Sequence, residues 1–217
     1  MRQCRVTSCG APTASRFSSH CRKHKSHLRR QGDTDQTAIR KSELTPYCSR
    51  VRSRIAKNDQ NPLWDHLGDT WTAIVSDART NANRLVQNRY ERKAANMIVG
   101  IDGDTPPREI IITTAAMFML LTERPTRFTS DGAFRLQLAK RVLGLSRANT
   151  GLRYDHATGS QKRVHREIGP KAAAIFGRKL AVAFGPLGLR LAKLEKRDAE
   201  RIETMTSNIR NALRELT

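Results

Sequence analysis

The chain has 217 residues, and 40 Lys and Arg against 20 Asp and Glu leave a formal net charge of +20. A basic excess of this size favours a polyanionic partner, nucleic acid or an anionic membrane. The longest apolar run, which begins at Glu109, is too short and too interrupted by Thr to span a bilayer, and residues 1–32 are too polar for a secretory signal. We therefore expect a cytoplasmic protein that binds nucleic acid and has no membrane partner.

Three of the four cysteines lie near the start of the chain, in the spacing Cys4-x4-Cys9-x11-Cys21-x2-His24. Zinc prefers four sulfur and nitrogen ligands in a tetrahedron, and two short ligand pairs supply them. In an intracellular chain, clustered cysteines are more often metal ligands than disulfides. The pattern predicts a Zn²⁺ site of Cys4, Cys9, Cys21 and His24 in a finger that spans residues 1–33.

The fourth ligand has alternatives, because His20 and His27 are also within reach of the cysteines. The two-residue spacing from Cys21 favours His24. A finger of about 30 residues cannot bury a sufficient core, so zinc affinity would supply most of its folding free energy. Cys48 lies in a helical pattern with apolar neighbours, and we expect it to be a small core residue outside the site.

The stretch from Cys4 to Asp33 resembles the short treble-clef-like or zinc-ribbon-like fingers of phage and mobile-element proteins, some of which lie beside HNH endonuclease domains. The four ligands match, and "HLRRQGD" matches the basic helix that ends at Gly-Asp. The resemblance covers roughly an eighth of the chain. It implies a mobile-element context in the cytoplasm of a bacterium or phage host. Nothing downstream offers a His–Asn–His constellation, so it does not imply nuclease chemistry.

The finger also carries a dense positive charge, since residues 1–32 contain no acid at all. A small metal-folded unit of this charge is suited to phosphate contacts, which set affinity without reading sequence. The candidate nucleic-acid-binding residues of the finger are Arg5, Arg16, Arg22, Lys23, Lys25, Arg29 and Arg30.

Beyond a polar linker at 34–41, residues 42–217 read as one helical domain. A helix is expected from Ser42 to Lys57, and a second from Pro62 through Ala78, which could run on through Leu85 and Val86 to Met97. Thr105 and two prolines signal the start of a buried central helix that reaches Leu121. Its "IIITT" run leaves strand as the alternative. A further capped helix follows over residues 129–145. The fold class is mostly α, a multi-helix domain with a small N-terminal zinc-binding finger.

Residues 146–169 lack an apolar period and are expected to form a loop. The loop either grips phosphates, with Tyr154 able to stack on a base, or is simply solvated. Its candidate nucleic-acid-binding residues are Arg153, Tyr154, Lys162, Arg163 and Arg166.

Helical patterning resumes at Pro170, is broken at "GPLGL", and continues as a C-terminal helix over residues 187–216. Apolar residues recur there every three or four positions. They fit an ordinary core-facing helix or a coiled-coil seam between copies, although Asp198 interrupts a strict heptad. The seam makes a homo-oligomer possible.

No convincing catalytic constellation is present, and we expect the protein not to be an enzyme. Asp102, Asp104 and Glu109 cluster near Gly103 and could hold Mg²⁺. The sequence favours a zinc-containing accessory protein that binds duplex DNA in preference to RNA, together with a protein partner, in a recombination, replication or transfer complex. The alternatives are an RNA-binding ribonucleoprotein component and a small metal-dependent nuclease that would need Asp102 or Asp104.

Overall fold

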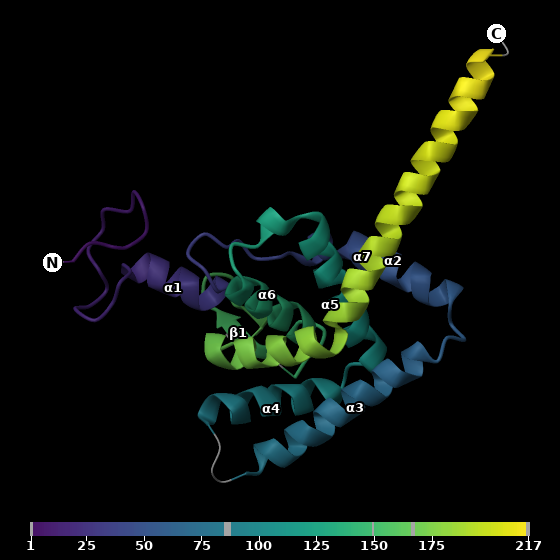
Figure 1. Cartoon of the computed structure of the whole chain (residues 1–217). Helices are drawn as coiled ribbons and strands as arrows, with labels where there is room; N and C mark the ends of the chain where they lie inside the picture. The colour runs from purple at the N-terminus through teal and green to yellow at the C-terminus, as the bar shows by residue number, and fades with distance from the viewer. Residues whose placement is uncertain (1, 85–87, 149, 166–167, 216–217) are drawn as a thin grey trace.

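The computed structural model describes residues 2–84, 88–148, 150–165 and 168–215 (Figure 1). Helices account for 67% of the described residues, which confirms the mostly α fold class. In chain order the elements of the described residues are α1 (Arg22–Gln31), α2 (Lys41–Lys57), α3 (Leu63–Ala82), α4 (Arg89–Asp102), α5 (Pro107–Glu123), the 3-10 helix η1 (Pro125–Arg127), α6 (Asp131–Leu143), β1 (Thr150–Asp155), β2 (Ser160–His165) and α7 (Pro170–Glu215).

Helix α5 is the centre of the body, because every residue from Ile110 to Leu120 is buried. Helices α2, α6 and α7 pack around it. The "IIITT" run is helical, so the expectation of a buried central helix is confirmed. The expected cap at Thr105 is wrong by one position, since the helix begins at Pro107 without a side-chain cap. Thr105 is buried instead, and its hydroxyl donates to Asp104.

Helices α3 and α4 lie side by side on one flank of the body. The pattern that could have run unbroken from Pro62 to Met97 is therefore two helices, and Leu85 and Val86 lie outside the described residues. Helix α2 buries the expected apolar stripe, and Cys48 packs partly buried against the core beside it.

Helix α7 runs from Pro170 to Glu215 without the break expected at "GPLGL", so the expected helix start at Leu187 is wrong. Pro186 bends the helix rather than ending it, as the change of direction in Figure 1 shows. Gly188 allows the bend to press against α5, because an added methyl group there would lie 2.7 Å from the Ala115 carbonyl oxygen.

The last part of α7 leaves the body and projects into solvent (Figure 1). Residues 196–211 are all exposed, including the apolar side chains of Ile202, Met205 and Ile209. The stretch Pro170–Asn211 is long and apolar enough to cross a membrane, but 50% of its most apolar window is buried inside the protein. A core helix of a globular protein has the same properties.

Residues expected to form the loop at 146–169 contain a β-hairpin, which corrects that expectation. Strands β1 and β2 pair antiparallel, with Leu152 opposite Arg163 and Arg153 opposite Lys162. The turn between them ends at Gly159, whose φ of +63° suits glycine. Arg166 lies outside the described residues.

The segment between α1 and α2 packs on the body through specific hydrogen bonds. Gln36 and Ile39 are each only 1% exposed. The Gln36 amide donates to the Arg127 carbonyl and accepts from the Thr129 N–H, and the Ile39 N–H donates to Gln137. The segment expected to be a polar linker is thus held in one place, while the domain boundary at residues 34–41 stays a prediction.

Candidate metal centre and nucleic-acid interface

The first ligand pair lies on a tight turn at the start of the chain. The Cys4 N–H donates to the Ala11 carbonyl at 2.9 Å and the Cys9 N–H donates to the Val6 carbonyl at 3.1 Å. Ser8, just before Cys9, and Gly10, just after it, have φ values of +64° and +59°, which fold the chain back around Cys9. Both sulfurs are thereby turned toward the same point.

The second ligand pair lies at the N-terminus of α1. Cys21 is the N-cap residue, and its sulfur accepts the His24 N–H at 3.5 Å. Because Cys21 and His24 share the first turn of one helix, their side chains lie on the same side of it.

The four side chains meet in one cluster. Cys4 Sγ and Cys21 Sγ each lie 3.4 Å from His24 Nδ1, and Cys9 Sγ lies 3.9 Å from Cys21 Sγ. All four ligand atoms lie within 4.8 Å of one another. Zinc–ligand bond lengths give tetrahedron edges of about 3.8 Å between sulfurs and about 3.6 Å between sulfur and nitrogen. The cluster therefore has the dimensions of a site that could hold a metal ion.

Electrostatics in the cluster favour a cation. Burial opposes ionisation of Cys4, but hydrogen bonds from the Cys21 and Val6 backbone and from His24 and Cys9 outweigh it and lower the pKa of the Cys4 thiol to about 6. The Ala11 N–H favours the Cys9 thiolate, yet burial and the sulfurs of Cys4 and Cys21 raise the pKa of Cys9. Three sulfurs at this distance repel one another as thiolates, and a divalent ion would remove that repulsion.

The alternative histidines are engaged elsewhere. His27 Nε2 donates to the Gln36 carbonyl at 2.8 Å, and His20 Nδ1 lies 2.9 Å from the Ser19 hydroxyl. Cys48 lies on α2, and burial raises the pKa of its thiol. Within the described parts of the chain, the cluster of Cys4, Cys9, Cys21 and His24 is the one group with metal-ligand geometry.

The cations of the finger lie on its exposed surface. The side chains of Arg5, Arg16, Arg22, Lys23, Lys25, Arg29 and Arg30 are all exposed. Arg16 stacks over the ring of Phe17 at 4.6 Å, and that ring is itself 85% exposed. Phe17 is not among the candidate nucleic-acid-binding residues predicted from the sequence. It is nevertheless the one large apolar side chain in the polar stretch between Cys9 and Cys21.

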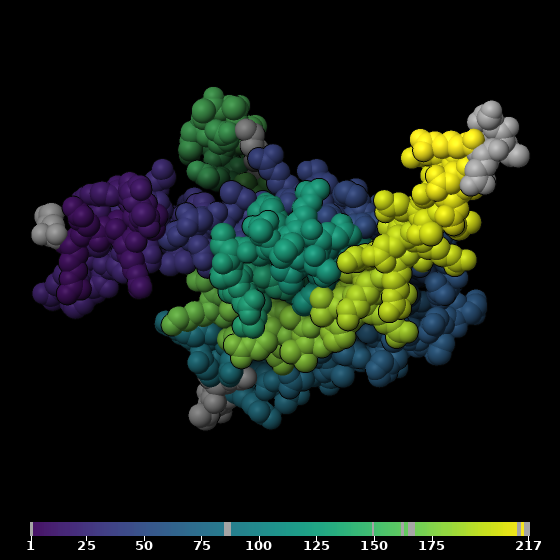
Figure 2. Space-filling model, turned by 45° about the horizontal axis from the view of Figure 1, so that its top comes forward, coloured from purple at the N-terminus to yellow at the C-terminus, as the bar shows by residue number. Residues whose placement is uncertain are grey.

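The hairpin places its candidate residues on a second projection. Arg153, Tyr154 and Arg163 are exposed, and the Tyr154 ring contacts the His156 ring edge-on at 4.9 Å. Lys162 lies opposite Arg153 in the strand register. Figure 2 shows the green hairpin standing off the body near the purple N-terminal finger.

The acids considered as a Mg²⁺ site have structural partners. Asp102 accepts the Trp71 indole N–H at 3.0 Å and pairs with Arg79 at 3.0 Å. Asp104 accepts the Arg147 N–H at 2.8 Å. Hydrogen bonds from Ser146 first, and then from the backbone of Arg147, lower the pKa of Asp104. These carboxylates form contacts between elements of the fold. They do not converge on a common point where a metal ion could bind.

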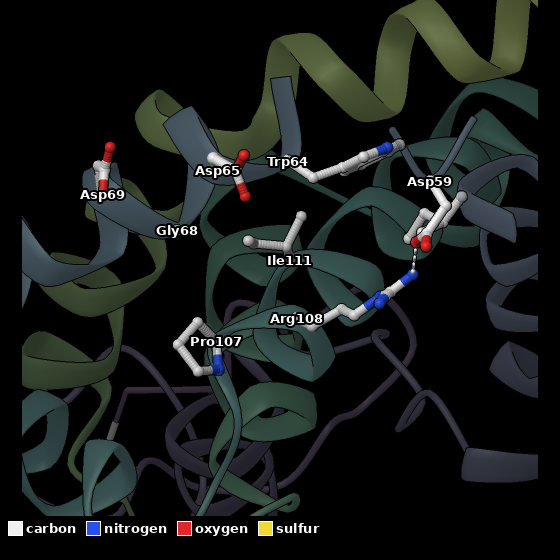
Figure 3. Close-up of a pocket in the computed structure, with 9 residues that line it drawn as sticks. Asp59, Trp64, Asp65, Gly68, Asp69, Pro107, Arg108 and Ile111 are labelled. Carbon is white, nitrogen blue, oxygen red and sulfur yellow. Dashed lines mark hydrogen bonds and ion pairs between the residues drawn. The ribbon is translucent and has the colours of Figure 1, made fainter. Parts of the chain in front are cut away.

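A cleft that the sequence did not reveal lies on the opposite part of the body, between α3 and α5 (Figure 3). Its volume is about 490 Å³, and Asp59, Asp65 and Asp69 line it together with Trp64. Arg108 pairs with Asp59 at 3.1 Å across one side. Three carboxylates against one guanidinium make this cleft unsuited to phosphate groups.

Comparisons with protein-family models, curated proteins and solved structures find no match to this chain.

Proposed function

We propose that this protein is a zinc-containing accessory protein that binds duplex DNA through its N-terminal finger. The observation that carries the proposal is a Cys3His cluster of zinc dimensions inside a projection whose surface is basic and free of acids. The metal would fold the finger, and the finger would present its cations to the DNA backbone.

Zinc is the metal that fits the donor set best. Three thiolates and one imidazole in a tetrahedron are typical of structural zinc sites, whereas magnesium and calcium prefer oxygen ligands. Four protein ligands leave no open position for a substrate or a water, so the site would serve structure and not catalysis.

The distribution of charge supports nucleic acid as the partner. Several acids of the body are paired with its arginines and lysines, as in Arg50–Glu123 and Arg127–Glu43. Residues 1–32 contain eight Arg and Lys and no acid. The excess positive charge therefore concentrates where the chain projects, and such a surface attracts phosphates from a distance.

A role in a mobile-element recombination, replication or transfer complex, in the cytoplasm of a bacterium or phage host, is a proposal that follows from the resemblance of the finger. Such an accessory protein would need a protein partner for any chemistry. The cleft lined by Asp59, Asp65 and Asp69 would stay free for protein contacts, because it repels DNA.

The test measures binding of the zinc-loaded full-length protein to fluorescent duplex DNA, single-stranded DNA and duplex RNA across a salt series. We expect duplex DNA to bind most tightly and the affinity to fall steeply with salt. Changing four finger cations to Ala should reduce the slope of log K against log salt by roughly 0.9 for each lost phosphate contact. The four cations are Arg22, Lys23, Arg29 and Arg30. Tighter binding of RNA or single strands would contradict the proposal and support the ribonucleoprotein alternative.

The matched control for the metal site compares a cysteine inside the cluster with a cysteine outside it. Cys9→Ser should lose bound zinc, measured by atomic absorption, and weaken DNA binding while the helical body stays folded. Cys48→Ser should keep the zinc content and the affinity, because Cys48 lies on α2 away from the cluster. Equal zinc content in both variants would refute the finger site.

A further inference from the structure

Beyond the finger, we propose that the β1–β2 hairpin is a second DNA-binding arm that enters the major groove of the duplex held by the finger. This inference rests on the proposed function, because it assumes that the finger binds duplex DNA. It adds to the phosphate contacts of the hairpin a second kind of contact, with the walls and floor of a groove.

The ribbon is exposed on both faces. Leu152 and Val164 point to opposite faces in the strand register, and they are 68% and 38% exposed. Tyr154 lies on the same face as Leu152 and is 49% exposed. An isolated two-stranded hairpin with apolar side chains on both faces is marginally stable in water. A ligand that covers both faces at once would stabilise it.

The hairpin carries a net positive charge. Among residues 150–165, Arg153, Lys162 and Arg163 stand against the single acid Asp155. The side chain of Asp155 accepts the Ala157 N–H inside the turn at 3.2 Å, so this carboxylate is used in shaping the tip. A basic ribbon with exposed apolar and aromatic side chains is complementary to a groove, where phosphates line the rims and base edges form the floor.

The dimensions of the hairpin match the major groove. Each strand has six residues and is about 20 Å long, and paired strands lie about 4.8 Å apart. The major groove of B-DNA is about 12 Å wide and about 8.5 Å deep and admits a two-stranded ribbon. The minor groove is only about 6 Å wide, so it would have to be widened. The major groove is therefore the better fit.

The finger is attached to helix α6, and the hairpin begins a few residues after the end of the same helix. The Gln137 amide on α6 donates to the Gln31 carbonyl at the end of α1, and Lys140 Nζ donates to the Arg30 carbonyl. The hairpin follows α6 in the chain, and Asp104 anchors its start through the Arg147 N–H. Both projections leave the body at the same end (Figure 1 and Figure 2).

This common base fixes the spacing of the two arms. Helix α6 has 13 residues and is about 20 Å long. One turn of B-DNA is about 34 Å long, so arms rooted within the length of α6 would reach the same turn of a duplex. The finger would hold the phosphates while the ribbon lies in the adjacent groove.

The experiment compares two fluorescent 20-base-pair duplexes, one with cytosine and one with glucosylated 5-hydroxymethylcytosine, whose sugars fill the major groove. We expect the zinc-loaded full-length protein to bind the glucosylated duplex at least tenfold more weakly. The double variant Leu152→Ser, Tyr154→Ser should lose most of that discrimination, while far-UV circular dichroism confirms that the helical body is folded.

A second variant changes only exposed cations of the hairpin, so its result does not depend on the apolar side chains that could affect hairpin folding. Arg153→Ala with Arg163→Ala should reduce the salt slope by about 1.8, since each lost phosphate contact contributes about 0.9. The matched control removes two exposed arginines from α7 with Arg190→Ala and Arg197→Ala, and it should keep the wild-type slope and discrimination. All of these variants should bind duplex RNA with the same affinity, because the major groove of duplex RNA is too narrow for side chains to enter.

Two results would overturn the inference while leaving the proposed function intact. One is equal discrimination by the wild type and by the Leu152, Tyr154 variant. The other is displacement of the wild type by netropsin, a minor-groove ligand. Absence of any duplex binding by the wild type would instead refute the proposed function, and the hairpin inference with it.

Discussion

Gly32 ends helix α1 with a φ of +94° and presses against the backbone of α6. A methyl group at this position would lie 2.8 Å from Ala133 Cα, closer than carbon atoms approach. The left-handed backbone adds a further penalty for any residue with a side chain. The junction between finger and body thus depends on a single glycine.

Gly32→Ala should lower the free energy of unfolding by about 1–3 kcal/mol, through strained backbone and displaced helices. Hydrogen exchange of the Ile39 N–H should also accelerate, because its acceptor Gln137 is part of the same junction. Chemical denaturation and exchange measured by mass spectrometry check both effects. The control is Gly68→Ala inside α3, where a methyl group meets no atom within 4 Å. It should be neutral or stabilising by up to about 1 kcal/mol.

The residues of the metal cluster could be predicted from sequence because their chemistry is rare and their spacing is local. Cys21 and His24 needed only the first turn of a helix to meet. The residues that fix the finger on the body could not be predicted in this way. Gln36 and Gln137 read as ordinary polar residues, and each finds its partners about 90 to 106 residues away in the chain. Such pairings depend on the completed fold.

At the scale of elements, apolar periodicity predicted α2, α3 and α6, and the start signal at Thr105 with its two prolines, followed by a nearly continuous apolar run, predicted α5. The hairpin was missed because its strands have neither an apolar run nor a clean alternation, since neither face packs on the core. A signal was present in the turn, where Gly159 follows "HAT" between a tyrosine-containing and a valine-containing segment. The bend of α7 was read as a break, because Pro and Gly mark helix ends by default. Packing against α5 overrides that preference.

The C-terminal stripe of α7 separates into a buried and an exposed part, and the two should respond differently to charge. Leu191 is 6% exposed and belongs to the core, whereas Ile202 is 64% exposed. Leu191→Glu should lower the free energy of unfolding by about 3–5 kcal/mol, because it buries an unpaired charge. Ile202→Glu should change it by no more than about 0.5 kcal/mol.

Thermal and chemical denaturation of both variants check this expectation, and sedimentation velocity reports their mass. A lower mass for Ile202→Glu than for the wild type would identify the exposed part of the stripe as a seam between copies. Strong destabilisation by Ile202→Glu at unchanged mass would contradict the projecting arrangement of α7 and place this residue against its own body.

At the scale of the whole molecule, the net charge of +20 is tolerated because carboxylates bridge the elements of the body. In each of three bridges the partner lowers the pKa of the carboxyl group. Arg127 lowers the pKa of Glu43 and joins α2 to η1, and Lys179 lowers the pKa of Asp77 and joins α3 to α7. The third is Asp104, which the Ser146 hydroxyl and the Arg147 N–H hold at the base of the hairpin.

These three groups predict a specific dependence of stability on pH. A carboxyl group whose pKa is lowered by folding stabilises the protein at pH values above its unfolded pKa, and that contribution is lost as the pH falls through the folded pKa. The unfolded pKa values of Asp and Glu are about 3.9 and about 4.3. For these three groups we expect the contribution to stability to be constant above about pH 5 and to decline steadily below about pH 4. Each proton taken up also raises the positive charge and adds repulsion.

Urea denaturation between pH 2 and pH 7 measures this profile. Glu43→Gln should lower stability at neutral pH and flatten the decline, because the variant has one less proton to bind on unfolding in acid. Glu200→Gln is the matched control, since Glu200 lies on the projecting part of α7 with a long 3.8 Å contact to Lys196. Its profile should follow that of the wild type. If Glu43→Gln also followed the wild type, the Arg127 contact would have no part in the acid response, and repulsion among the cations alone would account for it.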